Sequence, residues 1–179
     1  MVIALAGRRV DAPDAGTARF PLSNVELIAR RLDELFDLEK ATALVSSAAC
    51  GADLVALKVA GARRMRRRIV LPFDRARFRS TSVTDRPGDW GPHYDRILAE
   101  LDSGHDVLIL EGHSEEADAY LAVNRVILQD AVGLAARLST EAMAVLVWEG
   151  TPRGSDDTTA AFGQEAQQLG LRVGQVKTL

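Results

Sequence analysis

Short apolar runs alternate along the whole chain with longer segments in which apolar residues recur every three or four positions. Such an alternation is typical of β-α units stacked around a mostly parallel sheet. Several of the runs are apolar on consecutive residues, as in strands that helices cover on both faces. We therefore predict an α/β fold of three layers with a mostly parallel sheet. The expected strands are Val2–Ala6, Ala43–Ser46, Ile69–Leu71, Val107–Leu110, Ala144–Trp148 and Leu171–Val176, the last of which has the polar residues of an edge strand.

The segments between these strands are expected to be helices. The run Ser23-Asn24-Val25-Glu26 has the pattern of a capping box, and the first helix is expected to extend from there to about Phe36. The stretch 74–91 is predicted to be a long loop after a central strand, and loops of this length usually serve a function or are mobile. The other expected helices run from Ala52 to Arg64, from Pro92 to Leu101, from Glu115 to Leu138, and from after Ser155 to Leu169.

Composition limits the classes of protein to which the chain can belong. With 179 residues, 47% of them hydrophobic, it can bury a full core and is expected to form one domain, residues 1–179. Its formal charge of −3 provides no overall attraction to nucleic acid or to an anionic membrane. Cys50 is the single cysteine, and no stretch approaches the roughly 20 apolar residues of a membrane-spanning helix. The first apolar run is too short for a secretory signal, so a cytoplasmic location is expected.

The carboxyl ends of the strands carry the candidate binding residues, because ligands of open parallel sheets bind outside these ends. Gly7, Arg8 and Arg9 follow the first strand. A glycine permits close backbone approach, and guanidinium groups offer forked donors that suit phosphate. The alternative interpretation is that both arginines are solvated loop residues.

The turn after the second strand consists of small residues and opens a helix. Small side chains expose backbone N–H groups at the positive end of the helix dipole, where anions bind. The alternative is a tight turn in which Gly51 serves packing and Asp53 complements the dipole. Cys50, which lies in the same turn, is interpreted as a small packing residue. The candidate binding residues of this turn are Ser46, Ser47, Gly51, Ala52 and Asp53.

The turn after the fifth strand combines hydroxyls, glycines and a helix start, which points to phosphate or ribose. Asp156 and Asp157 fit equally well as helix-capping residues. Trp90 and Tyr94 could stack on a base above the crevice or anchor the long loop, and stacking is favoured. The candidate binding residues of the turn are Glu149, Gly154, Ser155, Asp157, Thr158 and Thr159.

Four blocks of sequence carry a family resemblance that extends over nearly the whole chain. They read IALAGRR, LVSSAACGADLVALKVA, RRIVLPF and VLVWEGTPRGSDDTTAAFGQEAQQLGLRV. Their order and spacing resemble the SLOG superfamily of Rossmann-like proteins, which contains the Lonely Guy phosphoribohydrolases, the core of the DNA-processing protein A, and many nucleotide-ligand sensors. The matching positions are Gly7 and Arg8, Gly51 to Asp53, Pro72 and Phe73, and Gly154 to Thr159. The resemblance implies a Rossmann-like fold and a nucleotide-type ligand, with Phe73, Trp90 or Tyr94 at the base.

The sequence departs from the Lonely Guy pattern at the position of the catalytic residue. Those hydrolases carry a Pro-Gly-Gly-x-Gly-Thr-x-x-Glu loop whose glutamate helps to cleave a glycosidic bond, whereas Ala161 or Phe162 falls at that position here. The first hypothesis is therefore that the protein binds or senses a nucleotide or nucleotide-derived small molecule. The alternative is a hydrolase or transferase that acts on a nucleoside or nucleotide N-glycosidic bond, with Glu149, Asp156 or Asp157 as the carboxylate. A third hypothesis is an accessory binder of single-stranded DNA.

Three further patterns bear on partners and metals. The basic run Arg63–Arg68 closes a helix at the edge opposite the crevice, so nucleic acid is not the expected partner. His113 and the glutamates around it are interpreted as a polar helix entry, and no metal is expected. The segment 115–138 is apolar on more than one side and requires a second apolar partner, either another helix or another subunit; a homodimer is favoured. Asn124, inside this segment, is expected to be paired or to lie on an exposed face.

Overall fold

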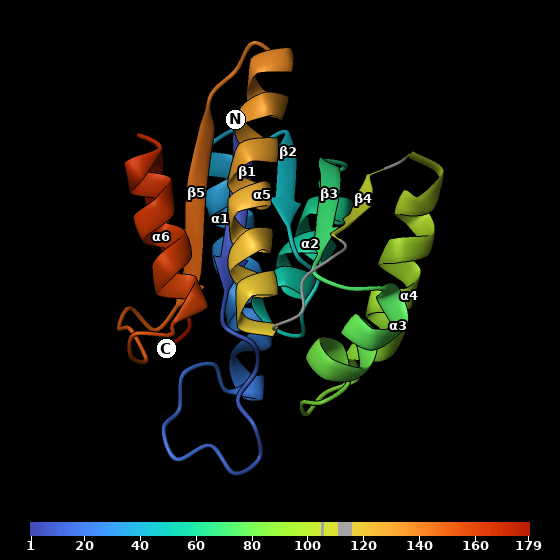
Figure 1. Cartoon of the computed structure of the whole chain (residues 1–179), viewed down its shortest axis with the longest axis vertical. Helices are drawn as coiled ribbons and strands as arrows, with labels where there is room; N and C mark the ends of the chain where they lie inside the picture. Colours follow the sequence, from blue (N-terminus) through green and yellow to red (C-terminus); the bar gives the residue numbers. More distant parts are fainter. Residues whose placement is uncertain (105, 111–115) are drawn as a thin grey trace.

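The computed structural model describes residues 1–104, 106–110 and 116–179. Within these residues, six strands form one sheet in the order β4-β3-β2-β1-β5-β6, and every pair of neighbours is parallel (Figure 1). The predicted parallel sheet is confirmed, and the last strand lies at one edge, as its polar residues indicated. The strands are β1 (Val2–Gly7), β2 (Ala43–Ser46), β3 (Arg66–Leu71), β4 (Val107–Ile109), β5 (Ala142–Trp148) and β6 (Arg172–Lys177).

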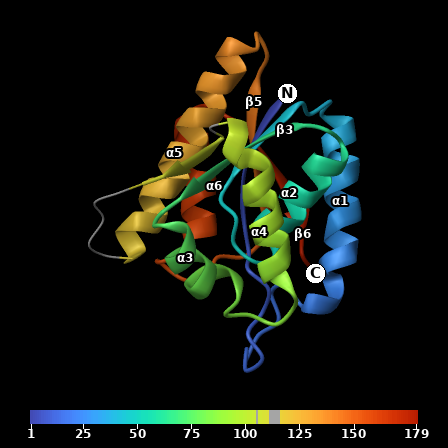
Figure 2. The same cartoon turned by 90° about the vertical axis from the view of Figure 1, so that its right-hand side faces the viewer.

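Helices cover both faces of the sheet, which makes this a Rossmann-like α/β fold of three layers (Figure 2). In β1, Ile3 and Leu5 pack into the cluster formed with α1, α2 and α4. The alternate residues, Val2 and Ala4, pack into the cluster formed with α5 and α6. Both sets are apolar because a parallel strand covered on both faces has no solvent side. The helices are α1 (Val25–Leu38), α2 (Ala52–Ala62), α3 (Arg75–Phe78), α4 (Trp90–Leu101), α5 (Glu116–Arg137) and α6 (Thr158–Gln168).

The order of the strands reverses at β1. The chain adds β2, β3 and β4 on one side of β1, and then adds β5 and β6 on the other side. In such a sheet, the connections after the strands on either side of the reversal diverge and leave a crevice at the carboxyl ends. In Figure 1 these carboxyl ends point downward, toward the protruding segment between β1 and α1.

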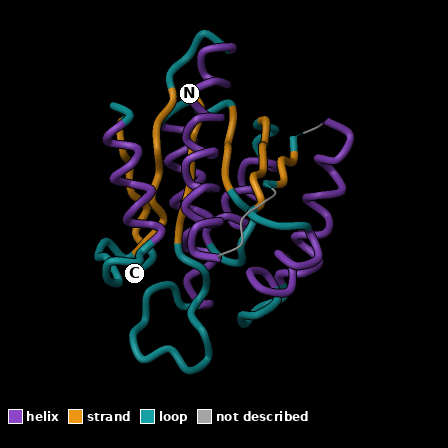
Figure 3. The backbone as a smooth tube through the Cα atoms, in the orientation of Figure 1, coloured by secondary structure: helices purple, strands orange, loops and turns teal. Residues whose placement is uncertain are grey.

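The long irregular segment lies elsewhere than predicted. The stretch 74–91 contains α3 and a π-helical turn, Arg79–Val83, and α4 begins at Trp90, two residues before the predicted start. Phe78 and Val83 are buried there, so the stretch is tied into the core. The irregular segment is instead 8–21, which is drawn as the long loop at the lower end of Figure 3. Its neck is closed by the Asp11 carboxylate, which accepts hydrogen bonds from the backbone N–H groups of Arg19 and Phe20.

The structure also bears on the predicted capping box at Ser23–Glu26 and on the second apolar partner of α5. The capping box is wrong, because Leu22–Asn24 forms a 3-10 turn, and the Asn24 side chain donates to the Thr178 carbonyl rather than capping α1. The second partner of α5 is found within the chain, because α5 packs on the sheet and also against α6, its neighbour on the same face. The homodimer therefore stays a prediction. In the described part of the chain, no helix is both long and apolar enough to cross a membrane.

Four of the five arginines in the basic run 63–68 form ion pairs with carboxylates. Arg63 bonds to Asp33 and Asp37 of α1, and Arg66 bonds to Asp106. Arg67 pairs with Glu100, and Arg68 pairs with Asp130 of α5. Since Arg66 to Arg68 open β3, they lie at its amino end, opposite the crevice.

Candidate functional site

A cleft of about 730 Å³ opens at the carboxyl ends of β1 and β2. One wall comes from the 8–19 segment, and another from the turn after β2 together with the π-helical turn. The far side is formed by Tyr120 and Asn124 of α5 and by the start of α6. Five segments that are distant in sequence therefore meet at the edge where an open parallel sheet binds its ligands.

Arg8 is the structural centre of this edge. Its side chain is only 3% exposed and lies between two carboxylates. Its Nε donates to Glu149 Oε2 at 2.7 Å, while Nη1 and Nη2 donate to the two oxygens of Asp157, each at 2.7 Å. Nη2 also donates to the Thr151 carbonyl at 3.0 Å. The guanidinium thus joins the end of β1 to both ends of the turn between β5 and α6.

The ion pairs set the charges of this cluster. Burial disfavours the charged form of Arg8, but the hydrogen bonds to Asp157 and Glu149 outweigh it and raise the Arg8 pKa. Burial likewise acts against the charged carboxylates, yet the hydrogen bonds from Arg8 hold the pKa of Glu149 and of Asp157 below their usual values. Both carboxylates are therefore ionised at neutral pH and fully engaged with protein partners. Asp156, the third carboxylate that the alternative hypothesis named, is exposed in the turn before α6.

The two helix starts are satisfied by the protein itself. Asp157 caps α6 by accepting hydrogen bonds from the N–H groups of Thr159 and Ala160. At α2, the N–H of Ala52 donates to the Arg8 carbonyl at 3.0 Å, and the N–H of Cys50 donates to the Ser82 carbonyl at 2.9 Å. The capping role that the sequence allowed for Asp157 is thus what the structure shows. These particular N–H groups already bond to protein acceptors.

Five arginines line the cleft, and two aspartates, Asp11 and Asp53, line it with them. Arg8 and Arg19 share Glu149, and Arg8 and Arg153 share Asp157. On the opposite side, Arg9 and Arg86 share Asp85. Five guanidinium groups thus divide three carboxylates among them, in a protein whose overall charge is −3. The Arg153 pKa is lowered, first by burial and then by the nearby charge of Arg8, as expected where cations crowd one another.

Asp53, in the first turn of α2, contributes a different kind of carboxyl group. Its side chain lines the cleft although the residue is only 6% exposed, and its Oδ2 accepts one hydrogen bond, from the N–H of Ala49 at 3.2 Å. Burial raises the pKa of Asp53 to about 7, against the smaller opposing effects of the Ala49 hydrogen bond and the Arg9 charge. Asp53 therefore exchanges a proton near neutral pH, which is the property of acid–base groups in functional sites.

The glycine after β1 is required by packing. A Cβ built on Gly7 would lie 2.4 Å from the Cβ of Ala52 and 2.7 Å from the Val147 carbonyl oxygen. The lack of a side chain at Gly7 therefore lets α2 and β5 pack closely against the end of β1. A Cβ built on Gly51, whose φ is +96°, would lie 2.7 Å from the Val10 nitrogen and 2.8 Å from the Arg8 carbonyl oxygen.

Replacement of Gly7 by alanine is expected to lower the free energy of unfolding by about 1–3 kcal/mol, because strand and helix must move apart to admit the methyl group. Chemical denaturation of the variant measures the loss. Gly16→Ala is the matched control, since a Cβ at that exposed position meets no atom within 4 Å, and its effect should stay within about 0.5 kcal/mol. Equal stability of the two variants would contradict the packing role of Gly7.

The structure brings only some of the predicted site residues together. Seven of them line the cleft: Gly7, Arg8, Arg9, Ser47, Asp53, Thr158 and Thr159. Ser46, Gly51, Ala52 and Pro72 are buried behind the lining, Gly154 and Ser155 are exposed in the turn before α6, and Glu149 and Asp157 hold Arg8. His113, with Glu111 and Glu115, lies outside the described residues; within them, no three His, Cys, Asp or Glu side chains are grouped as a metal site requires.

The aromatic residues expected at the base are placed differently. Trp90 and Tyr94 are buried in the core on the α4 side, where Tyr94 packs against Phe78, so they anchor the chain and are not part of the cleft lining as described. Phe73 lies behind the cleft, edge-on to Tyr120 at 6.0 Å. Tyr120 itself lines the cleft, and its hydroxyl shares a 2.7 Å hydrogen bond with Ser82.

Several cleft residues were missed by sequence reasoning. Arg19, Arg86 and Arg153 carry no motif, and only their positions after strands or beside turns could have drawn attention to them. Asn124, read from the sequence as paired or exposed, is buried and donates to the Thr158 carbonyl at 2.8 Å. It thereby joins α5 to the start of α6 at the cleft.

Comparisons with known proteins concern the fold. No protein-family model matches the sequence, and a search of curated proteins finds no match. Among solved structures, the chain is similar to DNA processing protein A from Streptococcus pneumoniae, with 15% sequence identity and a TM-score of 0.46. The alignment covers 96% of this chain and 57% of that protein, so the chain spans somewhat more than half of its length.

Proposed function

We propose that the cleft binds a nucleotide or nucleotide-derived small molecule and that the protein acts as a binding or sensing module for it. The observation that carries the proposal is the surplus of arginine at a cleft on the carboxyl edge of a Rossmann-like sheet. Anionic ligands of such sheets bind at this edge, and guanidinium groups suit phosphate. The volume of about 730 Å³ falls within the roughly 300–1,000 Å³ of small-molecule sites.

The walls of the cleft offer partners for each part of such a ligand. The arginines would hold phosphate groups. Hydroxyl groups of Ser47, Thr158 and Thr159 would contact the ribose, with Asp53 beside them. The exposed side of Tyr120 would carry the base, since Phe73 supports its ring from behind. Arg8 has a positioning role in this arrangement, because its donors are taken by Glu149, Asp157 and Thr151.

One observation favours an enzyme as the second candidate. Asp53 lines the cleft and has a pKa of about 7, so it could donate or accept a proton at neutral pH. A hydrolase or transferase acting on an N-glycosidic bond would use Asp53, and not Glu149 or Asp157, as its acid–base group. Retention or loss of the base on a bound nucleotide separates the two candidates.

A thermal-shift screen tests the proposal with nucleotides, cyclic nucleotides, ADP-ribose derivatives and short single-stranded DNA, each followed by chromatography of the incubated ligand. A ligand at about a hundredfold its Kd adds roughly 2.7 kcal/mol, which raises the Tm of a chain of this size by about 5–10 °C. A nucleotide that stabilises the protein and stays intact supports sensing, and release of free base supports the enzyme. Absence of any shift from a folded protein contradicts both candidates.

A matched pair of variants ties the shift to the cleft. Ala15 and Ala18 are both exposed on the segment 8–21. Of these two, Ala15 lines the cleft and Ala18 does not. Ala15→Trp is expected to abolish the shift by filling the cleft, whereas Ala18→Trp should retain it. A shift that survives in Ala15→Trp would place the ligand elsewhere.

A further inference from the structure

Two arginines of the cleft, Arg86 and Arg153, make only long contacts with carboxylates. The Arg86 Nε is buried and has no hydrogen-bond acceptor among the described residues; the nearest carboxylate oxygen, Asp85 Oδ2, lies 3.5 Å away and already bonds to Arg9 at 2.9 Å. An unsatisfied buried donor on a charged group is costly, so a native protein normally supplies it with a partner. A bound anion would be such a partner.

Arg153 is the second of these arginines. Its closest carboxylate oxygen, Asp157 Oδ2, is 3.9 Å from its Nε, and that oxygen already accepts from Arg8 at 2.7 Å and from the Arg153 backbone N–H at 2.7 Å. Burial lowers the Arg153 pKa first, and the positive charges of Arg8 and Arg19 lower it further. A negative group beside Arg153 would relieve this repulsion.

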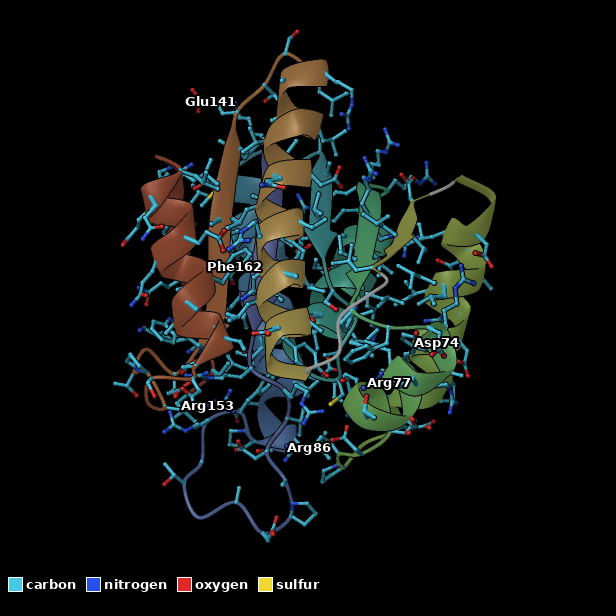
Figure 4. All side chains as sticks on the ribbon, viewed as in Figure 1. Asp74, Arg77, Arg86, Glu141, Arg153 and Phe162 are labelled. Atoms are coloured by element: carbon cyan, nitrogen blue, oxygen red, sulfur yellow. The ribbon has the colours of Figure 1, made fainter. Side chains whose placement is uncertain are left out.

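The two arginines come from different walls of the cleft. Arg86 follows the π-helical turn, on the side of α3 and α4, whereas Arg153 lies in the turn before α6. Figure 4 shows both at the carboxyl edge of the molecule, Arg153 below α6 and Arg86 nearer to α3. A second cation lies close to each of them. Arg9 shares Asp85 with Arg86. Arg19, which pairs with Glu149, lies near enough to Arg153 for its charge to lower the Arg153 pKa.

We propose that Arg86 and Arg153 form two anion subsites, one on each wall, and that the ligand of the cleft therefore carries at least two phosphate groups. This inference rests on the proposed function and narrows its ligand class to nucleoside diphosphates and dinucleotide-type or bisphosphate compounds. The subsites are built from arginine side chains, and several N–H groups at the starts of α2 and α6 already bond to Arg8, Ser82 and Asp157.

Titration calorimetry tests the subsites with adenosine, AMP, ADP, ADP-ribose and adenosine 3′,5′-bisphosphate, and with the guanosine counterparts, at constant ionic strength. The best two-phosphate probe is expected to bind at least tenfold more tightly than the monophosphate. Arg86→Gln and Arg153→Gln should each weaken that probe by about tenfold or more, because each loses charge-assisted hydrogen bonds to phosphate. Both variants should bind the nucleoside as the wild-type protein does.

Arg30→Gln is the matched control, since it removes the same charge from the exposed face of α1 and should leave all affinities unchanged. If Arg86→Gln folds poorly, Arg86→Lys replaces it in the test. This variant keeps the positive charge but lacks the forked donors of the guanidinium group, so its affinity for the two-phosphate probe should be intermediate. Equal affinity for the nucleoside and its diphosphate, with no loss in either variant, would overturn the subsites and leave nucleotide binding standing. Loss in only one variant would overturn the two-phosphate class, and binding of no probe at all would overturn the proposed function as well.

Discussion

Replacement of Arg8 by methionine is expected to lower the free energy of unfolding by about 3–5 kcal/mol. The change removes the closest guanidinium from Asp157 and one of the two arginine partners of Glu149, and it leaves both buried carboxylates with fewer donors. A buried charge without a partner costs more than the net contribution of the intact pair, so the effect is large even though buried ion pairs contribute little by themselves. Urea denaturation at neutral pH measures the loss.

The loss caused by Arg8→Met should depend on pH. In the wild-type protein the carboxyl pKa values of Glu149 and Asp157 are depressed, so their contribution to stability is present above the unfolded values and is lost as pH falls through the folded ones. The difference between the two proteins should therefore shrink below about pH 4, where the carboxyls of the variant become protonated.

Arg9→Met provides the matched control for the neighbouring arginine. Arg9 is paired with Asp85, but both side chains are about 30% exposed, and such pairs contribute about 0–1 kcal/mol. If Arg9→Met lowered the free energy of unfolding as much as Arg8→Met does, the difference in exposure between the two arginines would not explain their contributions to stability. A loss below about 1 kcal/mol in Arg8→Met would contradict the structural role assigned to the cluster.

Replacement of Asp53 by asparagine is expected to stabilise the protein at pH 8. Because burial raises the folded pKa to about 7, the folded chain binds the Asp53 proton more tightly than the unfolded chain does. The free energy of unfolding therefore falls as pH rises from about 4 to about 7, by up to about 4 kcal/mol, and Asp53 causes no further change above that range. An amide avoids this cost and can still accept the hydrogen bond from the Ala49 N–H.

Thermal denaturation between pH 5 and pH 9 checks this prediction. The Tm of Asp53→Asn should exceed that of the wild-type protein most above pH 7, and the two should converge toward pH 4–5. Asp89→Asn, at an exposed position before α4, serves as the control and should follow the wild-type curve. A variant that is less stable than the wild-type protein at pH 8 would show that the ionised Asp53 carboxylate is stabilised in the fold.

Much of the architecture was predictable because it depends on local apolar patterns. All six expected strands occur, and β2 has the predicted bounds, since a strand covered on both faces is marked by consecutive apolar residues. The location of the cleft followed from the same pattern, because a parallel sheet gathers its carboxyl ends at one edge. The errors were concentrated where polar residues take part in helices and strands. For example, β3 begins at Arg66, three residues before its predicted start. Its first arginines can belong to the strand because they form ion pairs with Asp106 and Glu100.

The sequence by itself determined the α/β class, the order of the six strands and the edge at which their carboxyl ends gather, since these depend on the periodicity of apolar residues. Only the tertiary structure decided which charged groups near that edge are free to bind a ligand. Arg8 and Arg86 look alike in the sequence, yet one is enclosed by Glu149 and Asp157 while the other has a buried donor without an acceptor. The difference depends on residues up to 149 positions away along the chain, and pairing at that separation has no local pattern.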